Sequence, residues 1–127
     1  MTAAKRDVTT AELAVLEKLW EHGVATLKQL SKWLYAGDTP SNVATVQKLI
    51  TRLENKGFVA RDRSFWPHRF HAVADRERLV TLRLQAAADD LCDGSLATLL
   101  MQAVKSTKFS PRQRKRLRKL LDELDKD

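Results

Sequence analysis

The stretch ATVQKLITRLENKGFVARDRSFWPHRFHAVA, residues 44–74, changes its hydrophobic period at Gly57. Before the glycine, apolar residues recur at i, i+3, i+4 and i+7, which predicts an amphipathic helix whose buried stripe consists of Val43, Val46, Leu49, Ile50 and Leu53. After the glycine, apolar and polar residues alternate, which predicts two short strands, 58–63 and 69–73, joined by residues 64–68. The stretch therefore predicts a helix, a glycine stop and a basic β-hairpin.

The same helix, expected from about 42 to 56, has an unusual outer face. At about 100° per residue, the side opposite the apolar stripe carries small, polar and basic residues: Ala44, Lys48, Thr51 and Asn55, with Thr45 and Arg52 on one flank. This outer face carries no carboxylate near the start of the helix, which falls between Thr39 and Asn42, although acidic residues favour helix N-termini. This face is suited to an anionic partner.

Two further helices are expected upstream. Thr9 and Glu12 form a capping box ahead of a helix that Gly23 ends, and Thr26 and Gln29 form a second box. The turn residues 37–40 then separate this second helix from the third. Three helices followed by a hairpin is the order of a winged helix-turn-helix domain, in which the third helix enters a DNA major groove and the hairpin touches the flanking backbone.

The rest of the chain predicts three more amphipathic helices. They cover about residues 76–92, a segment that Ser95 starts, and a segment that Ser110 and Pro111 start. Such helices have too little partner surface within one chain, so we expect them to interlock with a second copy. The apolar positions expected in that dimerisation region are Leu96, Leu99, Leu100, Val104, Leu117, Leu120, Leu121 and Leu124.

Length and composition set wider limits. A chain of 127 residues suits one domain or a domain with a small appendage. No apolar run approaches the roughly 18 residues that cross a bilayer, and no secretory leader is evident, so we expect a cytoplasmic protein without membrane contact. The net charge of +7 favours a polyanionic partner, and residues 40–73 alone hold six basic and two acidic residues.

These motifs resemble the penicillinase repressor family of bacterial transcription regulators. The matching segments are VTTAEL at 8–13, LWE at 19–21, TV at 45–46 with LITRL at 49–53 and KG at 56–57, and GSL at 94–96. The resemblance implies a mainly α fold with a small β-hairpin, in which residues 1–74 form a winged-helix DNA-binding domain and residues 75–127 a helical dimerisation region. It also implies a homodimeric repressor on a palindromic operator of double-stranded DNA.

The inducing signal stays open. Some family members are cleaved at an Asn-Phe bond in the dimerisation region, but residues 102–103 are Gln-Ala here. Copper-responsive relatives carry a C-terminal cysteine cluster, whereas this chain has one cysteine, Cys92. A sensor-linked protease and an unidentified inducer are both compatible with the sequence.

On this reading, individual residues of the helix have distinct roles. Ala44 and Thr45 are small enough to let the helix approach thymine methyl groups, and Lys48 reaches guanine or a phosphate. Asn42 bonds to a phosphate or to adenine. Arg52, more than a turn further along, holds the backbone and does not read bases.

In the hairpin, 58–73, we expect Arg61, Arg63 and Arg69 to share one side and to contact phosphates. Trp66 is expected to pack on its own hairpin, with insertion into a minor groove as the less favoured alternative. His68 and His71 lack a third ligand, so we expect neither a metal site nor a pH sensor. Cys92 is expected to be a small buried hydrophobe.

The segment 105–119 holds eight basic residues and no acidic one. The favoured interpretation is a solvated helix face, and the alternative is a second contact site, for nucleic acid or for an acidic partner. A winged-helix module that binds a protein through this helix is accordingly the second functional hypothesis. No glycine-rich phosphate loop, serine elbow, carboxylate pair or metal cluster is present, so the sequence predicts no enzyme, cofactor or metal.

Overall fold

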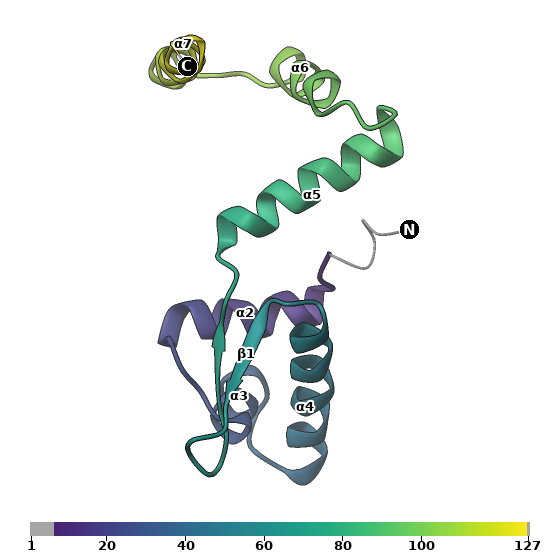
Figure 1. Ribbon diagram of the computed structural model, residues 1–127, viewed down its shortest axis with the longest axis vertical. Helices are drawn as coiled ribbons and strands as arrows, with labels where there is room; N and C mark the ends of the chain where they lie inside the picture. Colours follow the sequence, from purple (N-terminus) through teal and green to yellow (C-terminus); the bar gives the residue numbers. More distant parts are fainter. Residues whose placement is uncertain (1–6, 127) are drawn as a thin grey trace.

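The computed structural model describes residues 7–126, which form helices and one small antiparallel hairpin. In chain order the elements are α2 (Thr10–His22), α3 (Leu27–Leu34), α4 (Pro40–Asn55), β1 (Val59–Asp62), β2 (Arg69–Ala72), α5 (Arg76–Leu91), α6 (Leu96–Ser106) and α7 (Pro111–Asp125). Figure 1 shows α2 to α4 and the hairpin gathered at one end, with α5 leading away from them to α6 and α7 at the other. The predicted fold class, mainly α with a winged helix-turn-helix, is confirmed.

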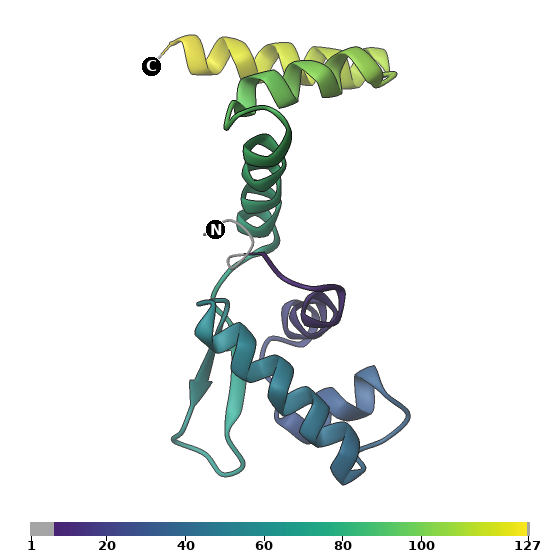
Figure 2. The same ribbon diagram turned by 90° about the vertical axis from the view of Figure 1, so that its right-hand side faces the viewer.

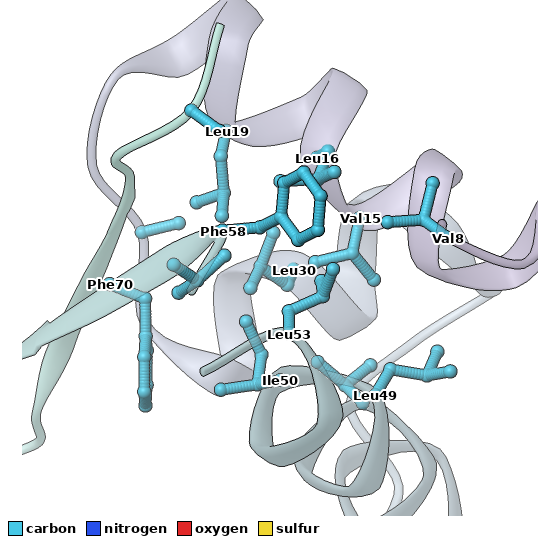
Figure 3. Close-up of a cluster of buried hydrophobic side chains, with 14 of the residues drawn as sticks. Val8, Val15, Leu16, Leu19, Leu30, Leu49, Ile50, Leu53, Phe58 and Phe70 are labelled. Carbon is cyan, nitrogen blue, oxygen red and sulfur yellow. The ribbon is translucent and has the colours of Figure 1, made fainter. Parts of the chain in front are cut away.

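The core lies where α2, α3, α4 and the hairpin converge. Its large side chains, drawn in Figure 3, include Leu16, Leu30, Ile50, Phe58 and Phe70, all essentially inaccessible to solvent. On α4, the predicted stripe is buried at Val46, Leu49, Ile50 and Leu53, and Val43 is half-buried. The helical period at residues 43–53 therefore identified both the helix and the face that anchors it.

Side-chain caps start the helices where the sequence predicts. Thr9 and Glu12, and Thr26 and Gln29, form complete capping boxes on α2 and α3. Thr39 caps α4, with Pro40 as its first residue, so α4 begins within the expected range of residues 39–42. Because an N-cap oxygen satisfies a free backbone N–H at the helix start, each cap fixes where its helix begins.

The hairpin pairs Val59 with Ala72 and Asp62 with Arg69. Both strands are slightly shorter than predicted: Phe58, Arg63 and Val73 lie outside them, although the Val73 N–H still donates to the Phe58 carbonyl. Phe70 also exchanges two backbone hydrogen bonds with Ala25, in the loop between α2 and α3. This third partner fastens the hairpin to the helical body.

The turn between α3 and α4 is held through one carbonyl oxygen. The Gly37 carbonyl accepts a hydrogen bond of 2.7 Å from Ser31 Oγ and one of 3.2 Å from Asn42 Nδ2. Ser31 is fully buried, and Asn42 lies in the first turn of α4. The two side chains thus fix the N-terminal end of α4 relative to α3.

A buried ion pair joins the start of α2 to the end of α4. Lys56 Nζ lies 2.7 Å from Glu12 Oε1 and donates to the Asp7 carbonyl at 2.9 Å. Glu12 is fully buried, and its Oε1 also accepts the Thr9 N–H. Burial alone would raise the pKa of Glu12, but Lys56 and Thr9 together lower it below the usual value of 4.5.

We expect this lowered pKa to make the fold sensitive to acid. The unfolded chain binds a proton on Glu12 at a higher pH than the native chain, so the contribution of Glu12 is complete above pH 4.5 and is lost as pH falls below it. Urea unfolding at pH 6 and pH 3.5 measures the loss. The Glu12→Gln variant should lose less stability between these values, and an equal loss in both proteins would contradict the assignment.

The helix α5 is attached to the body by specific contacts. Trp20 Nε1 donates to the Ala74 carbonyl at 2.8 Å, and the Arg76 guanidinium lies over the Trp20 ring. Further along α5, Arg83 Nε lies 2.9 Å from Asp7 Oδ1 and Nη2 donates to the Val8 carbonyl. These contacts set the direction in which α5 leaves the body.

Beyond α5 the helices bury little of their surface. No residue of α6 or α7 is buried, although α6 packs against α5. Cys92, which follows α5, is half-buried, so its expected burial was wrong: its backbone ends a helix at the edge of the molecule. Among residues 7–126, no helix is long and apolar enough to span a membrane.

Candidate nucleic-acid interface

The outer face of α4 is exposed and positively charged. Ala44, Thr45, Lys48 and Arg52 are all exposed, on the side of α4 away from the core. Lys48 and Arg52 take part in no ion pair among the described residues. Since unpaired exposed cations keep their charge available to an outside anion, this face is the first part of a candidate nucleic-acid interface.

Two polar residues on this helix make hydrogen bonds within the chain. Thr45 Oγ1 donates to the Ser41 carbonyl at 3.1 Å, which uses its one hydroxyl hydrogen. Asn42 is half-buried, and its amide nitrogen donates to the Gly37 carbonyl. Asn42 therefore has a structural role at the α3–α4 turn that the sequence analysis did not predict, because nothing in the local pattern pairs its side chain with the Gly37 carbonyl.

Arg61 lies between the hairpin and α4. Its Nη2 is 2.8 Å from Glu54 Oε1 and its Nε is 3.2 Å from Glu54 Oε2. The guanidinium also lies over the Phe70 ring, and only 20% of the side chain is exposed. This two-point contact fixes the hairpin against the last turns of α4. Glu54 had no predicted role, since no sequence period relates it to a residue across the Gly57 turn.

The three hairpin arginines do not share one side, so that expectation was wrong. Paired residues of an antiparallel hairpin lie on the same face, and Arg61 is paired with Phe70 whereas Arg69 is paired with Asp62. Arg69 thus lies on the face opposite Arg61. Both Arg63 and Arg69 are exposed, and neither takes part in an ion pair shorter than 4.0 Å among residues 7–126. Alternation along one strand shows which of its residues share a face. It does not show which face of the other strand they match, because that depends on the register between the strands.

The tip of the hairpin carries two exposed aromatic side chains. Trp66 is 86% exposed and Phe65 45% exposed, so the expectation that Trp66 packs on its own hairpin was wrong. Among residues 7–126, the aromatic ring that contacts the indole is that of His68, which lies edge-on to it. The Arg69 guanidinium covers the Phe65 ring instead, 3.8 Å from its centroid.

The loop itself is closed by a short polar contact. Asp62 Oδ1 accepts the Ser64 N–H at 2.8 Å. This bond lowers the pKa of Asp62, and the nearby charge of Arg69 adds to the effect. The turn that presents the aromatic tip is therefore held by an ionised aspartate.

Histidine and acidic side chains do not gather into a metal site in the part of the chain that is described. No group of three or more His, Cys, Asp or Glu residues is placed to hold a metal ion between residues 7 and 126. His68 instead faces Arg61, at 3.4 Å from Nδ1 to Nη1. His71 lies on β2, on the same face of the hairpin as Asp62, which is the residue paired with Arg69.

The C-terminal positions predicted for dimerisation form exposed apolar surface. Leu117, Leu120, Leu121 and Leu124 on α7 are 40–62% exposed, and Leu100 and Val104 on α6 are 46% and 58% exposed. Leu96 and Leu99 are half-buried. An open hollow of about 520 Å³ lies along α7 and is lined in part by Phe109, Leu117 and Leu120. Among the described residues, none of α7 is buried.

Figures 1 and 2 relate these surfaces in space. In both views the N-terminal end of α4 and the tip of the hairpin lie at one end of the molecule, and α6 and α7 lie at the other. The basic helix face and the exposed arginines of the hairpin can thus meet one partner together. The apolar face of α7 is left free for a different contact.

Comparison with known proteins identifies the family of this chain. The family model described as "Penicillinase repressor" matches residues 8–123, nearly the whole chain. A search among curated proteins found no match. Among solved structures, a MarR family protein from Bacillus stearothermophilus is 24% identical, with 94% of this chain and 74% of that chain covered and a TM-score of 0.46. With its matched family, helix order and basic hairpin, the chain belongs to the penicillinase repressor family of DNA-binding transcriptional regulators, which are not enzymes.

Proposed function

We propose that the chain is a homodimeric repressor that binds a palindromic operator with one α4 in the major groove of each half-site. Residues 1–74 are the DNA-binding domain and residues 75–127 the dimerisation region, although residues 1–6 and 127 lie outside the described part of the chain. The protein acts in the cytoplasm, where its promoter is. Half-sites one or two helical turns apart, multiples of roughly 34 Å, fit two copies related by a twofold axis.

The single observation that carries this proposal is the charge and exposure of the α4 outer face beside the hairpin. Ala44 and Thr45 give a close approach to base edges, and Lys48 reaches into the groove. Arg52, Arg63 and Arg69 are exposed cations suited to phosphates. Arg61, engaged by Glu54, positions the hairpin and supplies less charge to DNA.

Gel-shift titration tests the proposal directly. The purified dimer should bind its own promoter region more tightly than random duplex of equal length, and binding should weaken as salt rises because counterions are released from the phosphates. Equal affinity for promoter and random duplex would refute the sequence-specific role. Genome-wide mapping of bound sites then supplies the operator and, through neighbouring genes, the class of inducing signal.

Substitutions should separate base reading from phosphate contact. We expect Lys48→Ala to cost about 1 to 3 kcal/mol on the operator and to relax its base preference, because a contact to a base edge is lost. Arg63→Ala should weaken operator and random duplex alike and reduce the salt slope by about 1. If both variants lose selectivity equally, the roles assigned to these two residues are wrong.

A second candidate function rests on the segment 105–119. None of its eight basic residues forms an ion pair within residues 7–126, and all are exposed. In this alternative the winged helix is an interaction module, and α7 docks an acidic protein. Association with such a protein in the absence of any promoter shift would favour it over the repressor.

A further inference from the structure

Trp66 differs from the other two tryptophans of the chain. Trp20 is half-buried and donates its indole N–H to the Ala74 carbonyl, and Trp33 is half-buried and stacked on His22 at 3.8 Å between ring centroids. Trp66 is 86% exposed and its N–H has no acceptor among the described residues. A tryptophan buries roughly 150–250 Å² when it finds a partner, so one that stays this exposed is suited to an external contact.

The tip that carries Trp66 has a defined shape. The Asp62–Ser64 bond closes the turn on one side, and Arg69 stacks on Phe65 on the other. His68, which contacts the Trp66 ring edge-on, lies within 3.4 Å of Arg61, which is itself held by Glu54 of α4. The indole is therefore connected to α4 through a chain of contacts, which sets its position relative to this helix.

The surroundings of the tip match a DNA duplex better than a protein surface. The exposed cations Arg63 and Arg69 flank the aromatic pair, and no acidic side chain other than Asp62 lies within residues 55–74. The hairpin tip and the start of α4 lie at the same end of the molecule in Figures 1 and 2. With α4 in a major groove, the neighbouring feature of the same duplex is a minor groove bordered by two phosphate backbones.

We propose that Trp66 enters this minor groove and reads its base composition, an inference that rests on the proposed DNA-binding function. The indole N–H donates to the acceptors that A·T pairs present there, adenine N3 and thymine O2. The ring itself presses against, or partly between, adjacent base pairs. Pyrimidine–purine steps such as TA open at the lowest cost, so the hairpin should prefer a TA step in an A·T-rich flank, outside the bases that α4 contacts.

The proposal separates Trp66 from Arg63 and Arg69 by mechanism. The arginines bind phosphates, which are the same for every sequence, whereas the indole contact depends on groove width and base-step flexibility. Loss of Trp66 should therefore flatten the sequence preference in the flank alone and leave the preference under α4 intact.

The experiment uses the full-length protein and a duplex selected by it from a random library. We expect Trp66→Ala to weaken binding to this duplex about tenfold, comparable to the loss of one aromatic–base contact, and to bind duplexes with G·C flanks as the wild type does. Trp66→Phe should retain part of the flank preference, because the ring remains but the N–H is lost. Arg63→Ala is the matched control on the same hairpin: it should weaken binding to A·T and G·C flanks equally.

Acrylamide quenching gives a readout that a purely structural role would not move. Subtracting the fluorescence of Trp66→Phe from that of the wild type isolates the Trp66 signal, which should be strongly quenched in free protein and protected in the complex. Because Trp66 is exposed, both variants should keep the wild-type circular dichroism spectrum and melting temperature.

The outcomes distinguish this inference from the proposed function. If no duplex is enriched over random sequence, the repressor proposal itself fails. If Lys48→Ala loses operator selectivity while Trp66→Ala binds all flanks as the wild type does, only the inference that Trp66 reads the minor groove is overturned. A Trp66 signal that stays open to acrylamide in a saturated complex overturns it as well.

Discussion

Leu120→Asp is expected to convert the protein to monomers and to lower operator affinity by a factor of about 10² to 10⁴, the usual gain from linking two binding modules. Leu120 is 55% exposed on the face of α7 that also carries Leu117, Leu121 and Leu124. In the proposed dimer a carboxylate there would be buried against a second apolar face without a partner, which is costly. Sedimentation measures the assembly, and gel shift measures the affinity.

Lys115→Gln is the matched control for this substitution. It changes the charge of α7 by the same amount, but position 115 lies on the side of the helix opposite the leucines. This variant should remain dimeric and should bind the operator nearly as well as the wild type. A Leu120→Asp protein that sediments as a dimer would place the interface elsewhere, and monomeric wild type would refute the dimer altogether.

Lys56→Met is expected to destabilise the fold by about 3 to 5 kcal/mol, because it leaves a buried carboxylate without its cation. Glu12 is completely inaccessible, and its Oε2 already has no hydrogen-bond partner among the described residues. The methionine retains most of the length of the lysine stem, so the loss comes chiefly from the missing charge. Urea unfolding at neutral pH provides the free energy.

Two further variants make this result specific. Lys48→Met places the same substitution on the outer face of α4 and should change stability by about 0.5 kcal/mol or less, as is usual for surface sites. Glu12→Gln/Lys56→Met removes both charges and keeps an acceptor for the Thr9 N–H, so it should recover much of the loss. A Lys56→Met protein as stable as wild type would mean that water satisfies Glu12.

Periodicity and capping were enough to predict most of the fold. The spacing of Val46, Leu49, Ile50 and Leu53 fixed the buried face of α4, and its outer face followed by geometry. Thr9, Thr26 and Ser110 marked helix starts because their hydroxyls can satisfy backbone N–H groups only there. These are local signals, and local signals are readable in a single chain.

Contacts between distant or independently phased segments could not be predicted in this way. The face occupied by Arg69 depends on strand register, and the engagement of Arg61 depends on how Glu54 approaches it across the Gly57 turn. The exposure of Trp66 depends on the shape of the connection between the strands, residues 63–68. In each case the residue type indicated a class of interaction, while the tertiary structure decided its partner.

The attachment of α5 bears on the spacing of the two operator half-sites in the proposed dimer. Trp20 bonds to Ala74 just before this helix, and Asp7 pairs with Arg83 within it, so α5 is attached to the body at two points. Its 16 residues span about 24 Å, at 1.5 Å for each residue. In the proposed dimer, the length of α5 then sets the separation between the two copies of α4. The outer face of α4 would select the bases, and α5, which does not contact DNA, would set the spacing between the half-sites.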